Sequence, residues 1–271
     1  MCDHHDADNE ASEPGALSRI DRRGLLRGAA ATGLALTAGA CETTYNPETG
    51  REQFIMVSDA QMEQAALQAW GQQLQRERAW NNRAAQARLE RVGQRIVNAA
   101  GRGNQPWEFR LFDSPQKNAF VLPANKVGFY RGLYEICDVD DYMATVLGHE
   151  TGHVTGRHAA ERYSREVATQ TVVQVAGAAT NSDLAAAALG LGAQVGVSLP
   201  FSREQEAEAD ILGIRYMHAA GYDVRQAIPF WQRMAQGGGS RPPEFLSTHP
   251  DPDNRIQRIR NYINERGWGP V

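Results

Sequence analysis

Two histidines four residues apart, His149 and His153, enclose a glutamate in the stretch His-Glu-Thr-Gly-His. An α-helix has about 3.6 residues per turn, so side chains four positions apart lie on one face and both imidazoles can reach the same cation. Glu150 follows His149 directly, where it can take a proton from a water molecule held by that cation. No proline or alternating strand pattern precedes the stretch, which favours the helix. These residues therefore predict a metal site with a general base beside it.

A catalytic zinc site needs a third protein ligand and one open position. His158 is the nearest further histidine along the chain. On an unbroken helix, however, it points about 180° away from His149 and about 140° away from His153. We therefore expect His158 to be a structural or surface residue.

Two acidic residues further along the chain, Glu206 and Asp210, are stronger candidates for the site. They lie four residues apart in a helix predicted over 203–219, so one carboxylate can bind the metal while the other orients a ligand imidazole. Taken alone, such an acidic turn is typical of a solvated helix face. Downstream of a His-Glu-x-x-His helix, the same turn favours a metal site.

Two stretches of the chain together resemble one family of metallopeptidases. Residues 149–158 read HETGHVTGRH and residues 202–210 read SREQEAEAD. In this order they resemble the HtpX-like and CaaX-prenyl-protease-like gluzincins, and within them the bacterial periplasmic lipoprotein members of the LoiP and BepA type. The resemblance covers residues 58–265 and does not extend to the tetratricopeptide repeats of BepA-like members.

The resemblance implies a role for each residue of the two motifs. It implies one Zn²⁺ per chain, bound by His149, His153 and Glu206. It also implies that Glu150 is the catalytic base and that Asp210 supports a ligand histidine. The implied function is that of a zinc-dependent endopeptidase of the bacterial cell envelope, which hydrolyses unfolded or misassembled proteins as part of protein quality control.

Two further stretches match the family. Residues 118–123 resemble the strand segment before the active-site helix, although Ala124 and Asn125 replace the usual Gly-Gly pair and leave the turn geometry open. The Ser-Thr-His-Pro stretch around His249, followed by Arg255, resembles the family's C-terminal histidine motif. This implies that His249 approaches the zinc, either as an extra ligand that restrains activity or as a catalytic residue that assists the reaction. Without the family, His249 reads as a loop histidine.

The first forty residues predict export from a bacterial cytoplasm. The order Arg-Arg-x-Leu-Leu-Arg from Arg22 resembles a twin-arginine signal, and the apolar run 28–40 ends in small residues before Cys41. We therefore expect residues 1–40 to be a signal peptide with a lipobox, and Cys41 to be lipidated. The alternatives are cleavage after Ala40 without lipidation, and a retained anchor, although the run is shorter than the ~20 residues that span a bilayer. The predicted location is the periplasmic side of the envelope, with the outer membrane favoured.

The remaining residues predict an α+β fold that is mainly helical, a zincin-like domain with a small β-sheet beside the active-site helix. We expect a tether over 41–57, with turn formers between Asn46 and Gly50, and a zinc metallopeptidase domain over 58–271. The Ala- and Gly-rich segment 167–200 favours a buried helical hairpin over a membrane span, because polar residues interrupt it. Helices are predicted at 58–79, 83–100, 138–163, 203–219, 224–236 and 252–265, and strands at 107–112, 118–122 and 127–130.

Composition and charge narrow the classes of partner. Hydrophobic residues make up 42% of the chain and charged residues 22%, as in ordinary soluble domains, and a net charge of −4 argues against a nucleic-acid binder, which needs a basic face. The expected partners are protein or peptide substrates and, through the lipid on Cys41, a membrane, while the oligomeric state stays open. Two alternatives to the endopeptidase remain: a non-catalytic, zinc-bound lipoprotein that acts as a chaperone or scaffold, and an integral membrane peptidase that spans with residues 184–199.

Overall fold

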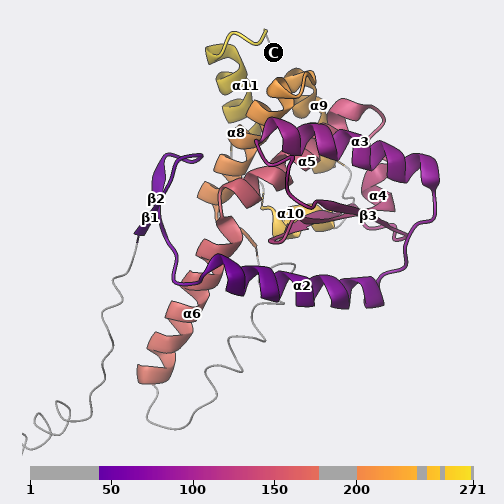
Figure 1. The fold of residues 1–271 in the computed structure, drawn as a ribbon. Helices are drawn as coiled ribbons and strands as arrows, with labels where there is room; N and C mark the ends of the chain where they lie inside the picture. The colour runs from indigo at the N-terminus through magenta and orange to yellow at the C-terminus, as the bar shows by residue number, and fades with distance from the viewer. Residues whose placement is uncertain (1–42, 177–199, 237–242, 251–253, 270–271) are drawn as a thin grey trace, which may run out of the picture. The chain divides into compact units, whose positions relative to one another are not determined.

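The structure is a computed structural model that describes residues 43–176, 200–236, 243–250 and 254–269. The predicted fold class, α+β and mainly helical, is confirmed (Figure 1). The strands are β1 (Thr43–Asn46), β2 (Arg51–Phe54), β3 (Glu108–Phe112), β4 (Ala119–Leu122) and β5 (Lys126–Tyr130). The described helices are α2 (Asp59–Arg76), α3 (Arg83–Ala99), α4 (Arg131–Tyr134), α5 (Asp140–Thr155), α6 (His158–Ala176), α8 (Arg203–Ala219), the 3-10 helix η1 (Val224–Gln226), α9 (Ala227–Gln236), α10 (Glu244–Thr248) and α11 (Arg255–Glu265).

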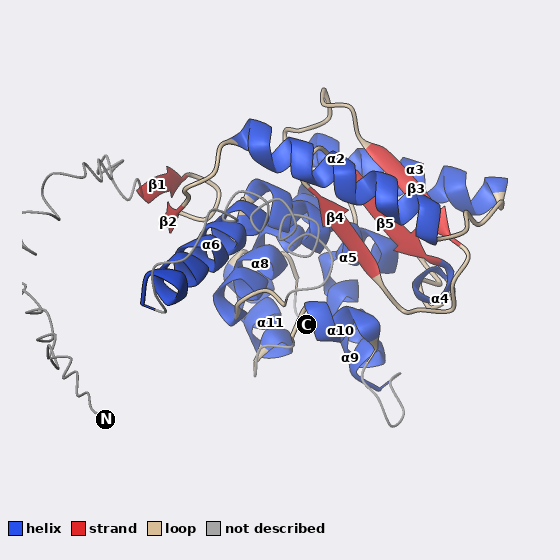
Figure 2. Ribbon diagram, turned by 90° about the horizontal axis from the view of Figure 1, so that it is seen from below, coloured by secondary structure: helices blue, strands red, loops and turns tan. Residues whose placement is uncertain are grey.

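Three strands form a mixed sheet in the order β3-β5-β4, in which β3 runs parallel and β4 antiparallel to β5. Successive side chains point to opposite faces of a strand. On one face, Phe112 and Phe120 pack against Trp70 of α2. On the other face, Phe109 and Phe129 join the main hydrophobic core with residues of α3 and α5. The sheet therefore lies between α2 and α3 (Figure 1), and the view from below has α2 in front of the strands (Figure 2).

Small residues let α5 and α8 approach with their backbones almost in contact. A methyl group added to Gly152 would lie 2.8 Å from the carbonyl oxygen of Ala209, and one added to Gly148 would lie 2.9 Å from the carbonyl oxygen of Gly213. Both distances are shorter than an ordinary contact between carbon and oxygen, so larger residues would push the helices apart. This packing brings the acidic first turns of α8 to the two histidines of α5.

The single long helix predicted over 138–163 is in fact two helices. α5 ends before Gly156, and Arg157 takes a left-handed backbone conformation with φ of 53° before α6 begins. A side chain on Gly156 would meet the ring of His158 at 2.3 Å, so a glycine is needed where that ring folds back against the chain. Because the helix is broken, His158 does not point away from His153 as predicted, and its Nδ1 lies 2.9 Å from that of His153.

Residues 43–54 form a β-hairpin where the sequence predicts a tether. β1 and β2 pair in antiparallel fashion around the predicted turn formers. Asn46 Nδ2 donates to the carbonyl oxygen of Thr155 at 3.1 Å, and Gln53 Nε2 donates to that of Gly156 at 2.6 Å, so the hairpin is held against the end of α5. The tether prediction fails for these residues because polar side chains attach the hairpin, and such contacts leave no hydrophobic pattern in the sequence.

A short helix without a sequence signal, α10, places His249 at its C-terminal end. The N–H of Phe245 donates to the carbonyl oxygen of Lys117, just before β4, and the N–H of Phe201 donates to that of Thr248, just before His249. These two backbone hydrogen bonds hold α10 between the sheet and the start of α8. His249 therefore lies in a turn that hydrogen bonds hold in place, and not in an unattached loop.

Several predictions fall outside the described residues. They concern the signal peptide over 1–40, lipidation at Cys41, and most of the apolar segment 167–200, of which the part up to 176 belongs to α6. None of the described helices combines the length and the hydropathy that crossing a bilayer requires.

Candidate metal centre and active site

Four buried side chains from three parts of the chain turn their donor atoms toward one another. They are His149 and His153 of α5, Glu206 of α8, and His249 after α10, and their donor atoms all lie within 4.8 Å of one another. The structure therefore brings together the three residues predicted as metal ligands. It adds His249 to the same group.

Most separations between these atoms are close to those between neighbouring ligands of a small cation. His149 Nε2 lies 3.1 Å from His153 Nε2, 3.2 Å from His249 Nδ1 and 3.4 Å from Glu206 Oε2. Glu206 Oε1 lies 3.4 Å from His153 Nε2 and 3.1 Å from His249 Nδ1. Zinc bonds of about 2.0–2.1 Å in tetrahedral geometry place neighbouring ligand atoms about 3.3–3.4 Å apart. The donor set therefore fits Zn²⁺, and its nitrogen and oxygen donors suit a transition-metal ion.

Hydrogen bonding fixes which nitrogen of His149 faces the centre. Its Nδ1 lies 2.9 Å from Asp210 Oδ1, while Asp210 Oδ2 accepts a 2.8 Å hydrogen bond from Arg255 Nε. A carboxylate only accepts hydrogen bonds, so Nδ1 of His149 carries a proton and Nε2 faces the other donors, as in metal sites with a supporting carboxylate. Burial lowers the pKa of His149, but the charge of Glu206 and the hydrogen bond to Asp210 outweigh burial and raise the pKa to about 9. A metal ion that binds here therefore competes with a proton.

His153 makes its second contact with another histidine. Its Nδ1 lies 2.9 Å from Nδ1 of His158, whose Nε2 lies 2.9 Å from Glu208 Oε2. Burial lowers the pKa of His158 and holds the pKa of His153 well below its ordinary value, so both rings are neutral. His158 is fully buried and contacts a proposed ligand, which corrects the prediction that it faces away.

Arg255 of α11 joins the two acidic residues of α8. Its Nη2 donates to Glu206 Oε2 at 2.6 Å, its Nε donates to Asp210, and its guanidinium carbon lies 4.1 Å from the ring centre of Trp231. Burial alone raises the pKa of Glu206, but the charges of the neighbouring histidines and their hydrogen bonds hold it well below its ordinary value. Glu206 therefore enters the site as a carboxylate. The sequence motif that contains Arg255 gave no sign of this pairing, which depends on α11 packing beside α8.

The carboxylate of Glu150 is buried beside the four donor atoms without belonging to them. Its Oε1 lies 3.4 Å from His249 Nε2 and accepts no hydrogen bond from the described residues. Burial raises the pKa of Glu150, against the charges of the histidines and a hydrogen bond from the backbone N–H of Val121. A carboxyl group with a raised pKa and an oxygen without a hydrogen-bond donor suits a general base.

Aromatic rings hold His249 in place. Its ring stacks on Phe245, with centroids 4.3 Å apart and planes at 16°, and on Phe201, with centroids 5.2 Å apart and planes at 29°. Nδ1 of His249 faces His149 and Glu206, whereas Nε2 faces Glu150. In this arrangement His249 takes the fourth position of the donor set, which a catalytic zinc site leaves open for water.

The turn between β4 and β5 keeps the conformation that a Gly-Gly pair would adopt. Ala124 and Asn125 have φ angles of 69° and 60°, so two consecutive residues lie in the left-handed region. Asparagine enters this region readily, whereas alanine does so at a cost of about 1 kcal/mol. The departure from the family pattern therefore leaves the turn intact and strains Ala124.

Two residues outside the predicted set complete the surroundings of the site. Glu208 lies two positions after Glu206, about 200° around α8, so it faces a different neighbour and meets His158. The two-residue spacing of Glu206 and Glu208 was the sequence feature that could have indicated that the acidic turn contacts a second histidine. Arg51 of β2 pairs with Glu208, but nothing in its polar, turn-rich surroundings indicated this contact.

Comparison with known proteins gives a consistent picture. The profile of peptidase family M48 matches residues 83–263. The chain is 37% identical over 186 residues to the mitochondrial metalloendopeptidase OMA1 of Schizosaccharomyces pombe, which covers 65% of this chain and 52% of that protein. The protein of the same name from Saccharomyces cerevisiae is 31% identical over 261 residues, or 85% of this chain and 73% of that protein.

A bacterial relative is also similar. The beta-barrel assembly-enhancing protease of Yersinia pestis is 34% identical over 188 residues, which cover 65% of this chain and 38% of that protein. The match therefore spans about half the length of the fission-yeast relative and less than half of the bacterial one.

Proposed function

The chain belongs to peptidase family M48 and is a metallopeptidase, and from this membership we propose that it is a zinc-dependent endopeptidase of the bacterial cell envelope. The observation that carries the assignment of zinc is the buried donor set of His149, His153 and Glu206, whose nitrogen and oxygen atoms lie 3.1–3.4 Å apart. Glu150 stands beside this set, and its Oε1 accepts no hydrogen bond from the described residues, as a general base requires.

Each residue of the site has its own task in peptide hydrolysis. When bound, the metal supplies Lewis-acid chemistry, which activates water and polarises the scissile carbonyl group. Glu150 takes the proton of the attacking water on Oε1 and delivers it to the leaving amine. Asp210 holds the proton of His149 on Nδ1, and Arg255 pairs with both Asp210 and Glu206 in the buried site.

His249 restrains this activity in the arrangement described. Its Nδ1 completes the donor set and takes the position that the attacking water needs. Of the two roles that the family implies, we therefore adopt that of an extra ligand, which substrate binding displaces. The same side chain also lies against Glu150, since its Nε2 is 3.4 Å from Oε1 of Glu150.

The two edges of the sheet differ in their capacity to take up another strand. At the β3 edge, the side-chain amide of Gln86 donates to the Phe109 carbonyl oxygen at 2.7 Å and accepts from the Leu111 N–H at 3.2 Å. The N–H of Trp80 donates to the Leu111 carbonyl oxygen, so groups of the chain itself occupy this edge. β4, the other edge, packs along α5 beside the proposed catalytic base.

Substrate binding at β4 follows from this difference. An extended peptide can pair with a strand edge through backbone hydrogen bonds, and in β4 the Val121 N–H donates to Glu150, so a peptide bound there lies beside the proposed catalytic base. A cavity of about 460 Å³ at the end of β4, lined by Val121, Pro123, His153 and Phe201 among others, can receive substrate side chains. Pairing of this kind requires an extended chain without partners, so the proposed substrates are unfolded or misassembled proteins.

The envelope location rests on the leader. The twin-arginine-like stretch and Cys41 support export and lipidation, and one relative carries the name beta-barrel assembly-enhancing protease. We expect Cys41→Ala to move the protein from the membrane fraction to the soluble fraction of a bacterial host. Retention of the Cys41→Ala protein in membranes would rule out the lipid anchor.

The experiment that tests the peptidase proposal is digestion of an unfolded protein, such as reduced and alkylated casein. Glu150→Gln should bind Zn²⁺ as the wild type does and cleave at least about 100-fold more slowly, since general-base catalysis contributes about 10²–10⁴-fold. Glu265→Gln, an exposed change in α11, is the matched control and should cleave at the wild-type rate. A chelator should stop cleavage and added Zn²⁺ should restore it.

A metal-replete Glu150→Gln protein that still cleaves at the wild-type rate would contradict the role of Glu150. Inactivity of both the wild type and His249→Ala would favour the non-catalytic scaffold.

A further inference from the structure

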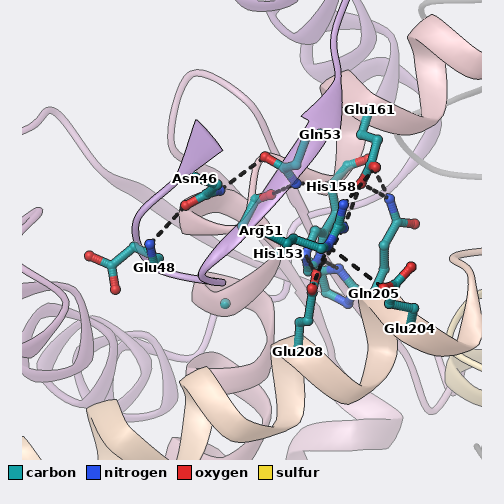
Figure 3. A network of polar contacts seen from close by, with 12 residues as sticks. Asn46, Glu48, Arg51, Gln53, His153, His158, Glu161, Glu204, Gln205 and Glu208 are labelled. Carbon is teal, nitrogen blue, oxygen red and sulfur yellow. Dashed lines mark hydrogen bonds and ion pairs between the residues drawn. The ribbon is translucent and has the colours of Figure 1, made fainter. Parts of the chain in front are cut away.

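A path of polar contacts runs from His153 to the N-terminal hairpin, as Figure 3 shows. His153 Nδ1 lies 2.9 Å from His158 Nδ1, and His158 Nε2 lies 2.9 Å from Glu208 Oε2. Glu208 in turn accepts hydrogen bonds from Nε and Nη2 of Arg51, the first residue of β2. The path therefore links a proposed metal ligand to a residue that precedes the region matched by the family profile.

The contacts along this path place the protons from the carboxylate inward. Glu208, paired with arginine, only accepts hydrogen bonds, so His158 donates to it from Nε2, and Nδ1 of His158 serves as the acceptor for the 2.9 Å contact with His153. His153 must then donate from its own Nδ1, which leaves the lone pair of Nε2 facing the other donors. The path thus selects the tautomer of His153 that binding of a metal through Nε2 requires.

A second carboxylate holds Arg51 in place. Nη1 and Nη2 of Arg51 each lie 2.8 Å from an oxygen of Glu161, whose side chain is fully buried. Gln205 of α8 also donates to Glu161, at 2.9 Å. A bidentate pair between arginine and a carboxylate fixes the orientation of the guanidinium group as well as its charge. Arg51 is therefore clamped between Glu161 and Glu208.

The hairpin that carries Arg51 is attached at the break between α5 and α6. Asn46 and Gln53 donate to the carbonyl oxygens of Thr155 and Gly156. The last carbonyl groups of a helix have no partners within the helix, so the hairpin supplies hydrogen bonds that the end of α5 lacks. The break that turns the His158 ring toward α5 is thus also the place where the hairpin binds.

Each of the two histidines of α5 that we propose as ligands is connected to a carboxylate that pairs with an arginine. His149 contacts Asp210, which pairs with Arg255 of α11. His153 reaches its carboxylate–arginine pair indirectly, through the imidazole of His158 and then Glu208 with Arg51 of β2. One arginine of this arrangement comes from the C-terminal helix and the other from the N-terminal hairpin.

We propose that Arg51 is a positioning residue of the metal centre, which acts through Glu208 and His158 to hold His153 in the orientation and tautomer that bind metal. The β1–β2 hairpin then contributes to metal binding, because it carries Arg51. The inference rests on the proposed ligand role of His153.

The test compares two arginines that bind the same carboxylate. Arg51 and Arg165 lie 2.8 and 2.7 Å from Glu161, but within the described contacts Arg51 alone also pairs with Glu208. In the full chain, we expect Arg51→Gln to weaken Zn²⁺ affinity by about 10-fold, the lower end of the loss that is typical for a direct partner of a metal ligand, because Arg51 acts through Glu208 and His158. The matched change Arg165→Gln should leave the affinity within about twofold, because Arg165 is half exposed and Arg51 still pairs with both Glu161 and Glu208. Competition with a chromophoric chelator measures both.

Further variants separate positioning from folding. Arg51→Lys keeps a charge for Glu161 but loses the two-pronged grip on Glu208, so it should recover part of the lost affinity. In a His158→Phe background, Arg51→Gln should cause no additional loss of Zn²⁺ affinity, because the path is already interrupted. In the Co²⁺-substituted protein, Arg51→Gln should alter the visible absorption of the metal, whereas Arg165→Gln should not.

The outcomes distinguish failure of this inference from failure of the proposed function. Wild-type Zn²⁺ affinity and Co²⁺ spectra in both Arg51→Gln and Arg51→Lys would overturn the inference, as would an effect of Arg51→Gln that persists undiminished without His158. His153→Ala provides the separate check. If His153→Ala binds Zn²⁺ as the wild type does, the proposed ligand set itself fails, whereas loss of binding in His153→Ala but not in Arg51→Gln removes the positioning role alone.

Discussion

Gly152 of α5 faces Ala209 of α8 so closely that a methyl group on Gly152 would lie 2.8 Å from the Ala209 carbonyl oxygen. Glu206 and Asp210 lie on the turns of α8 beside this contact, and His153 follows Gly152 directly. The distance between the two helix backbones therefore sets the distance between the proposed ligands. A backbone atom cannot move aside as a flexible side chain can.

Gly152→Ala is expected to destabilise the fold and the metal site together. Overpacking of this kind raises the free energy of the folded state by about 1–3 kcal/mol, and the displaced α8 should weaken Zn²⁺ binding. Gly71→Ala in α2 is the matched control, because a methyl group there meets nothing within 4 Å and alanine favours a helix by up to about 1 kcal/mol. Urea unfolding and chelator competition measure the two effects. Equal stability of Gly152→Ala and wild type would refute the close packing.

Binding of Zn²⁺ to the metal-free protein should release about one proton at pH 7.5. The charge of Glu206 and the hydrogen bond to Asp210 raise the pKa of His149 to about 9 despite burial, above the ordinary value of about 6.5. Between these two values the metal-free site holds a proton that the metal must expel. Burial keeps His153 neutral, so it contributes none.

Calorimetric titration in two buffers with different ionisation enthalpies counts the released protons. The number should fall toward zero as the pH rises above about 9. Asp210→Asn removes one of the groups that hold the proton on His149, so this variant should release fewer protons at pH 7.5. A count that does not change with pH would contradict the assignment of the proton to His149.

Removal of the fourth donor should increase peptidase activity. His249→Ala opens the position that Nδ1 now takes beside His149 and Glu206, and the rate should rise roughly tenfold for each ~1.4 kcal/mol by which His249 stabilises the closed arrangement. The rate of cleavage of unfolded casein is the measurement, with zinc content determined in parallel. Thr248→Ala changes the neighbouring residue, whose hydroxyl donates to the Phe245 carbonyl oxygen; the substitution keeps the backbone hydrogen bond with Phe201 and should leave the rate unchanged. A lower rate in a zinc-replete His249→Ala protein would instead assign His249 an assisting role.

Ala124→Gly should leave the fold as stable or make it more stable by up to about 1 kcal/mol. Ala124 has a φ of 69° in the β4–β5 turn, where alanine is strained by about 1 kcal/mol and glycine is not. Ala65→Gly, in the interior of α2, is the control and should lower stability by about 1 kcal/mol. Thermal unfolding compares the two. Similar losses in both variants would show that the turn is not left-handed at position 124.

Much of the local structure was predictable from short-range patterns. Ser58 with Gln61 and Ser202 with Gln205 form capping boxes at the starts of α2 and α8, as the sequences of these turns indicate. α8 spans the predicted residues 203–219. Such signals involve residues within one helical turn, so they do not depend on the rest of the fold.

Two predictions were wrong: one assumed an unbroken helix through His158, and the other derived a tether from the polar composition of residues 41–57. The direction of His158 was inferred from an unbroken helix, but Gly156 and the left-handed Arg157 interrupt it. The hairpin at 43–54 has no apolar stripe, because contacts such as Asn46 with the Thr155 carbonyl oxygen hold it. Polar attachment of this kind depends on the partner surface, which a local pattern does not contain.

The sequence by itself determined the two imidazoles on one face of a helix, the glutamate between them and the acidic turn of α8, because helical spacing converts directly into geometry. The resemblance predicted that His249 approaches the site, and the tertiary structure places its Nδ1 in the donor set. The tertiary structure alone decided that Arg255 pairs with the acidic turn and that Arg51 reaches His153 through two intermediaries. These contacts join residues up to 157 positions apart, and they form only after α5, α8, α11 and the hairpin have packed together. Helical geometry depends on residues that are close together in the chain. A buried ion pair forms only when tertiary packing brings distant parts of the backbone together.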